Sequence, residues 1–174
     1  MPLCPRCTLL ALALALLAFA GCDTNNPGSS LVEVQGVYSV EELTFDPTDP
    51  GALADVDVLA DLRVGTRVEV VGDGTALVRF QPLGSGASQI VFGSARATSR
   101  TVTFRVQTNE DADKLRRVLL PPSFTLNRDE TDPNRLSADL LLDDVDLEAY
   151  DPAAYTGLDR VRGRMTVTLD RIPG

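Results

Sequence analysis

The fold is decided by the stretch RVRGRMTVTLD at residues 160–170. Apolar or small residues occupy every second position, and arginine, threonine or aspartate occupies the positions between them. Side chains along a β-strand point alternately to opposite faces of a sheet, so this period of two places one face on a core and the other in water. The stretch therefore predicts a half-buried antiparallel strand, with its apolar residues from Val161 to Leu169 on the buried face.

Seven further segments have strand character and lie between turn-forming residues. Gly72-Asp73-Gly74 and Gly84-Ser85-Gly86 supply residues that tolerate the positive φ of tight turns. Short strands with local connections and polar outer faces are typical of antiparallel sandwiches and small closed barrels. We therefore predict a mainly β domain, either an antiparallel up-and-down β-barrel or a β-sandwich, with one or two short helices. The seven segments are 36–45, 67–71, 76–81, 89–95, 101–107, 123–127 and 136–142.

Two stretches favour helix instead. Asp49-Pro50 is a typical pair for the N-cap and first position of a helix, and leucine and valine recur at every third residue from 53 to 62. Asn109 is expected to cap a second helix over residues 110–120, which Pro121 ends.

The N-terminal segment predicts export. An n-region carrying Arg6 precedes an unbroken apolar run over residues 9–20, and Gly21 and Cys22 follow, which is the pattern of a secretory signal with a thiol at the cleavage site. The run is too short to cross a bilayer, which takes about 20 residues. Its ending resembles the lipobox of bacterial lipoproteins, in which a small residue and glycine or alanine precede the cysteine that receives diacylglycerol. The resemblance implies cleavage after Gly21 and lipid attachment at Cys22.

These features divide the chain into three parts. Residues 1–21 are expected to be a lipoprotein signal peptide, residues 22–34 a lipidated flexible tether, and residues 35–174 a single antiparallel β domain. Residues 23–30 are short, polar and turn-forming, as in flexible linkers. We expect the protein to be held in the cell envelope by its lipid, with the outer membrane favoured over the inner membrane.

Charge limits the class of partner, and cysteine positions indicate whether the mature domain contains disulfides. The chain carries 25 acidic and 16 basic residues, a formal net charge of −9, and no basic residue lies between Cys22 and Arg63. A nucleic-acid partner is excluded, because binding to phosphates needs a basic face. Cys4 and Cys7 precede the expected cleavage site, so the mature domain is expected to contain no disulfide and to rely on its core alone.

A second resemblance concerns the start of the β domain. Gly36-Val37-Tyr38 is similar to the Gly-x-Trp with which lipocalins and lipocalin-like lipoproteins begin. The resemblance implies an eight-stranded barrel that forms a cup for one small apolar ligand. It also implies that Tyr38 closes one end of the barrel and that an arginine of the last strand, Arg162 or Arg164, covers it.

The composition removes most catalytic options. Histidine is absent, which excludes Ser-His-Asp and Cys-His sites and imidazole ligands for zinc. Lys114 lies beside two arginines in the second expected helix, where solvated charge is the expected state. The acidic run 143–146 carries carboxylate groups, whose oxygen atoms suit calcium. Its spacing matches no EF-hand loop, so we expect these carboxylates to be solvated in a loop. Tyr150 and Tyr155 form either a recognition rim or a loop that packs on the barrel end. We predict no catalytic residue, no metal and no cofactor.

Three functions are compatible with these observations. The first is a membrane-anchored, non-catalytic lipoprotein that binds a small apolar ligand or serves as an accessory module. The second is a structural or assembly partner that pairs through sheet edges with an outer-membrane protein complex. The third is a hydrolase that uses paired carboxylates.

Overall fold

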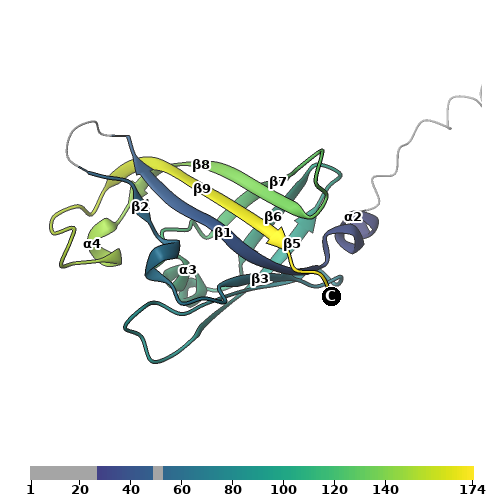
Figure 1. Ribbon diagram of the computed structural model, residues 1–174, viewed down its shortest axis with the longest axis horizontal. Helices are drawn as coiled ribbons and strands as arrows, with labels where there is room; N and C mark the ends of the chain where they lie inside the picture. The colour runs from purple at the N-terminus through teal and green to yellow at the C-terminus, as the bar shows by residue number, and fades with distance from the viewer. Residues whose placement is uncertain (1–26, 49–52) are drawn as a thin grey trace, which may run out of the picture.

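The computed structural model describes residues 27–48 and 53–174, which form one antiparallel β-barrel (Figure 1). The strand order is β2-β1-β3-β4-β5-β6-β7-β8-β9, and β1 also pairs with β9. Eight strands therefore close on themselves, while the short strand β2 adds to the edge of β1. The prediction of an up-and-down barrel is confirmed, and the sandwich alternative is wrong. The predicted signal peptide and Cys22 lie outside the described residues.

All eight predicted strands form, with ends within a few residues of those expected. The helices are α2 (Pro27–Val34), α3 (Asn109–Arg116) and α4 (Leu147–Tyr150), and a 3₁₀ turn, η1, covers Leu59–Asp61. The strands are β1 (Gly36–Pro47), β2 (Val56–Asp57), β3 (Arg67–Val70), β4 (Thr75–Phe80), β5 (Gln89–Ala97), β6 (Thr101–Val106), β7 (Ser123–Arg128), β8 (Arg135–Val145) and β9 (Val161–Arg171).

Strand β9 has the alternation that its sequence predicts. Val161, Met165 and Leu169 are at most 5% exposed, whereas Arg162 and Arg164 are exposed. The apolar face of β9 therefore forms part of the core inside the barrel. Its outer face is exposed at the two arginines, while Thr168 on that face is buried and donates a hydrogen bond to Glu42.

Two glycines inside the barrel are covered by aromatic rings. A Cβ atom built on Gly163 would lie 2.5 Å from Cε2 of Phe45 and 2.5 Å from the carbonyl oxygen of Asp46. A Cβ atom on Gly93 would lie 2.6 Å from Cζ of Phe104. Both rings therefore occupy space that small inward-facing residues would otherwise leave open.

Gly163→Ala is expected to destabilise the barrel by about 1–3 kcal/mol, because the added methyl group displaces the Phe45 ring or the backbone of Asp46. Gly86→Ala is the matched control, since no described atom lies within 4 Å of a Cβ atom there. Urea denaturation measures both variants. Equal urea midpoints for the two variants would show that the Phe45 ring moves aside without loss of stability.

Helix α2 closes one end of the barrel (Figure 1). Residues 27–34 were expected to belong to the flexible tether, and for this segment the prediction is wrong. Val34 is 1% exposed and Leu31 packs against the core. Side chains three residues apart lie on one face of a helix, so these two form a small apolar face that packs on the barrel, while Val32 of the same helix is exposed. The chain therefore docks onto the barrel several residues earlier than its composition indicates.

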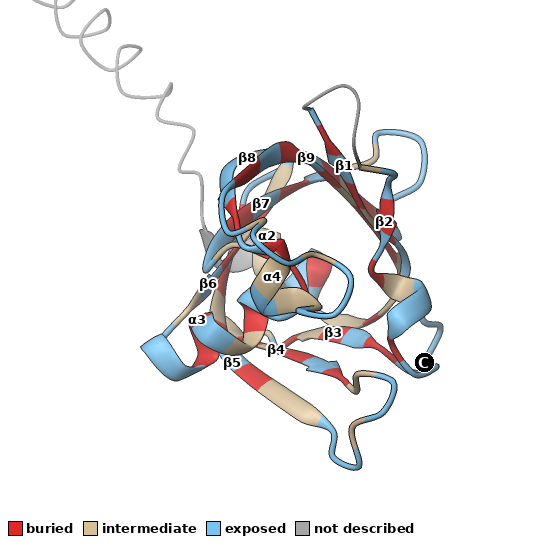
Figure 2. Cartoon of the chain, turned by 90° about the vertical axis from the view of Figure 1, so that its left-hand side faces the viewer, coloured by how far each residue is buried: buried red, intermediate tan, exposed pale blue. Residues whose placement is uncertain are grey.

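The opposite end, the mouth, carries the longer connections. These are residues 81–88, 107–122, 146–160 and the described part of 48–66, and α4 lies across the opening (Figure 2). Helix α3 is confirmed, but its N-cap is Thr108 rather than Asn109: the Thr108 hydroxyl accepts a hydrogen bond from the Asp111 N–H at 3.1 Å. The helix ends at Arg116, four residues earlier than predicted.

The first predicted helix is wrong. Residues 53–62 contain strand β2 and the 3₁₀ turn η1 instead, while residues 49–52 lie outside the described residues. Strand β3 pairs with β1 only up to Ser39, so the rest of that edge of β1 is free for another partner. The Val58 N–H donates to the Leu43 carbonyl of β1 at 2.9 Å. Pairing with β1 therefore outweighs the helical spacing of the apolar residues.

Candidate functional site

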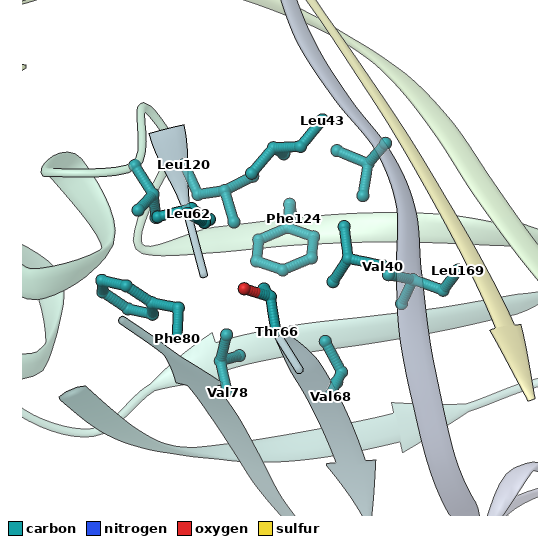
Figure 3. A pocket seen from close by; sticks show the side chains of 12 residues that line it. Val40, Leu43, Leu62, Thr66, Val68, Val78, Phe80, Leu120, Phe124 and Leu169 are labelled. Atoms are coloured by element: carbon teal, nitrogen blue, oxygen red, sulfur yellow. The ribbon is translucent and has the colours of Figure 1, made fainter. Parts of the chain in front are cut away.

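The interior of the barrel is apolar and almost completely filled. The remaining cavity has a volume of about 20 Å³, which is room for about one water molecule. The cup that the lipocalin resemblance implies is therefore occupied by the protein's own side chains in this structure. Of the twelve lining residues, all but Thr66 are apolar; they are Val40, Leu43, Leu62, Thr66, Val68, Val78, Phe80, Val118, Leu120, Phe124, Val167 and Leu169 (Figure 3).

Single side chains separate this cavity from two hollows at the mouth. Leu62 and Phe80 line both the cavity and an open pocket of about 770 Å³, which also contains Asp61 and Tyr150. Leu120 lines both the cavity and a groove of about 290 Å³. A rearrangement of one layer of side chains would thus connect the apolar interior with the outside.

Residues 115–120, which we name the mouth plug, fill the barrel opening. Leu115, Val118 and Leu120 are at most 6% exposed, and the Leu120 N–H donates to the Leu115 carbonyl at 3.0 Å. Leu119 has φ of 57°, a conformation that costs a residue with a side chain about 1–3 kcal/mol. The plug therefore contains both the apolar contacts that fill the mouth and a strained backbone position.

Residues 146–160, which we name the lid, include α4 and border the same groove as Leu119 and Leu120 of the plug. The Tyr150 hydroxyl donates a hydrogen bond to Oδ2 of Asp61 in η1. Burial raises the pKa of Tyr150, and the hydrogen bond to Asp61 raises it further, so the phenol stays protonated and remains a donor. The rings of Tyr150 and Tyr155 lie 6.4 Å apart. The tyrosines therefore pack the lid onto the barrel mouth, and Tyr150 ties it to the β1–β3 connection.

Tyr38 lies at the other end of the barrel, where it is fully buried. Its hydroxyl donates to the Val34 carbonyl of α2 at 2.7 Å. Burial raises the pKa of Tyr38, while Arg171 and Arg128 oppose that shift. Tyr38 therefore joins α2 to the closed end of the barrel.

The predicted pairing of Tyr38 with Arg162 or Arg164 is wrong. Tyr38 lies opposite Arg171 in the β1–β9 ladder, whereas Arg164 lies opposite Asp46, near the mouth. Arg162 also lies at the mouth end of β9, where it forms an ion pair. Arg171, the last arginine of β9, therefore lies where the resemblance places Arg162 or Arg164, because β1 and β9 pair along nearly their whole lengths.

The acidic run 143–146 makes contacts with strand β9 and with the connection that follows β8. Asp143 pairs with Arg162 at 2.9 Å, and Asp146 caps α4 by accepting the Ala149 N–H at 2.7 Å. Among the described residues, no group of three or more acidic, cysteine or histidine side chains is arranged to hold a metal ion. The run therefore contributes to the loop structure at the mouth.

Lys114 is held by two carboxylates of its own helix. Its Nζ lies 2.8 Å from Glu110 and 3.3 Å from Asp111. The hydrogen bond to Glu110 is the main reason why the pKa of Lys114 is raised. An ammonium group in this setting is a cation rather than a nucleophile.

Comparisons with protein-family models, with curated proteins and with solved structures find no match to this chain. In the described part of the chain, no helix combines the length and apolar character that crossing a membrane requires.

Proposed function

We propose that the protein is a lipid-anchored, non-catalytic binding protein of the cell envelope, which holds a small apolar ligand at the mouth end of its barrel. The observation that carries the proposal is an apolar cavity that one layer of side chains separates from the mouth pocket. In this proposal the structure represents the closed state. A ligand enters when the lid moves and the mouth plug withdraws.

Three properties of the mouth support such a movement. The plug has a strained residue, Leu119, whose conformation relaxes if the segment rearranges. The lid is a long connection, and among the described residues one side-chain hydrogen bond, from Tyr150 to Asp61, ties it to the β1–β3 connection. Withdrawal of Val118 and Leu120 would enlarge a cavity that is already apolar, and apolar cavities in proteins bind apolar molecules in preference to water.

Binding is tested with the fluorescent apolar probe N-phenyl-1-naphthylamine in stopped flow. We expect saturable binding to the wild-type protein. Tyr150→Phe should raise the association rate constant about fivefold, the factor that corresponds to loss of a hydrogen bond worth about 1 kcal/mol in the closed lid. Tyr155→Phe is the control, since within the described residues its hydroxyl donates no hydrogen bond.

The outcomes of this experiment separate the alternatives. Equal rates for the two variants would show that the lid does not control entry. Absence of saturable probe binding to every variant would contradict the proposed ligand class.

The lipid anchor is tested separately. Cys22 is the residue at which the lipobox resemblance implies acylation, so Cys22→Ser should move the protein from the membrane fraction to the soluble fraction and leave the signal peptide uncleaved. Fractionation followed by immunoblotting measures both effects. Unchanged membrane association of the variant would contradict the lipoprotein assignment. It would not change the interpretation of the probe-binding experiment.

A further inference from the structure

The barrel wall is incomplete between β7 and β8. Strand β8 pairs with β9 over nearly its whole length, from Arg135 to Val145, but it pairs with β7 only at Leu136 and Ser137. Every residue of both strands is described, and no further pairing joins them. The groove of about 290 Å³ lies beside the end of β8, between residues 141–146 and the segment 116–122 that leads into β7.

Hydrogen bonds at the ends of β8 show which main-chain groups face this gap. The Arg135 carbonyl accepts a hydrogen bond from Asp129 on the β7 side, while the Asn134 carbonyl accepts one from Arg171 of β9. Successive residues of a strand direct their N–H and C=O groups to alternate edges. The main-chain groups of odd-numbered residues of β8 therefore face the gap. Beyond Ser137, those of Asp139 and Leu141 make no hydrogen bond on this edge with any described residue, so they are available to a further strand.

The side chains along this edge define a pattern of charge. Asp139, Leu141 and Asp143 point outward, and Leu141 is 74% exposed. Leu140 and Leu142 point toward the barrel but are only half-buried, because β7 does not cover them. The outer face of a strand that pairs with this edge would thus lie beside Asp139, Leu141 and Asp143. Its inner face would lie beside Leu140 and Leu142.

We propose that the β8 edge is a docking site for an extended segment of a partner protein, in which basic residues flank an apolar one. Free main-chain groups beside a groove are the feature that β-strand addition uses. Cross-strand pairs of opposite charge favour basic residues opposite Asp139 and Asp143. Strand β9, on the other edge of β8, has one such pair of opposite charge, because Arg162 lies 2.9 Å from Asp143, whereas Asp139 accepts a hydrogen bond from Thr166 there.

A second copy of this chain fits the edge poorly. An antiparallel pair of β8 edges centred on Leu141 would place Asp139 of one copy opposite Asp143 of the other, and like charges directly opposite each other are destabilising. The net charge of −9 adds to that repulsion. The acidic residues of the β8 edge therefore favour a basic partner segment over a second copy of the chain. The site does not depend on ligand binding inside the barrel.

The test uses the full chain and a fluorescein-labelled peptide, Thr-Arg-Val-Leu-Val-Arg-Thr, whose binding is followed by fluorescence anisotropy. Two modified peptides separate the causes of binding. One carries glutamate in place of both arginines, and the other carries an N-methyl group on the central leucine, which removes the main-chain donor and keeps every side chain. We expect one-to-one binding of the parent peptide and about tenfold weaker binding of each modified peptide.

Protein variants locate the site. The double substitution Asp139→Asn with Asp143→Asn should weaken binding about fivefold, whereas Asp46→Asn with Asp55→Asn removes the same charge from another part of the surface and should leave binding unchanged. Equal binding of the N-methylated and parent peptides would overturn strand addition. Equal weakening by the two double variants, or self-association of the chain that the parent peptide does not reverse, would overturn the assignment to a basic partner at this edge.

Discussion

Val167→Asp is expected to lower the free energy of unfolding by about 3–5 kcal/mol, a large part of the roughly 5–15 kcal/mol that stabilises a typical domain. Val167 is 2% exposed and lies between Leu43 of β1 and Ala138 of β8. A carboxylate at this position has apolar neighbours on both sides. The variant should therefore be largely unfolded at moderate urea concentrations at which the wild type is folded.

Thr166→Asp is the matched control on the next residue. Thr166 lies on the outer face of β9 and donates a hydrogen bond to Asp139 at 3.0 Å. A second carboxylate beside Asp139 costs about 1 kcal/mol at most, because water solvates both groups. Urea denaturation followed by circular dichroism measures the two variants together. Equal free energies of unfolding would show that inner and outer positions of β9 do not differ as the barrel requires.

The strands were predictable because their signal is local. In β9 and β6 apolar and polar residues alternate over a few neighbouring positions, and the apolar positions are mostly the buried ones. Closure was not predictable in the same way. The ladder that closes the barrel pairs Tyr38 with Arg171, and no pattern within either segment indicates the other.

The errors have a common physical cause in tertiary contacts. Residues 56–62 have helical spacing, but β1 offers an unpaired edge and the segment forms strand β2 and η1 there. Residues 27–34 look like a linker, but Tyr38 and the core provide a surface for Leu31 and Val34. In both cases the deciding partner is elsewhere in the chain.

The candidate sites were only partly readable from the sequence. Gly36-Val37-Tyr38 correctly indicated a strand start with a buried aromatic residue, but the filled interior follows from how the Phe45 ring and the mouth plug occupy space. The strained φ of Leu119 has no signal in its residue type. One signal was available for the β8 edge: three consecutive leucines, 140–142, break the period of two and leave the middle one exposed.

Tyr38→Ala is expected to cost about 3–5 kcal/mol, because the ring is fully buried and its hydroxyl ties α2 to the barrel. Tyr38→Phe separates the two contributions. It keeps the ring and leaves the buried Val34 carbonyl without its donor, at a cost of about 1–2 kcal/mol. Thermal or urea denaturation gives both values. Similar losses for the two variants would show that the hydroxyl, and not the ring, carries the effect.

A double-mutant cycle then identifies the arginine that acts with Tyr38. Arg171 donates to the Glu33 and Gln35 carbonyls, so it holds the same end of α2 that Tyr38 holds through Val34. When one contact is lost, α2 loosens and the other contact contributes less, so Tyr38→Phe and Arg171→Met should show a coupling energy of about 0.5–1 kcal/mol. Arg162→Met should show none, because Arg162 pairs with Asp143 at the mouth. The opposite result, coupling to Arg162 and none to Arg171, would contradict the β1–β9 register that closes the barrel.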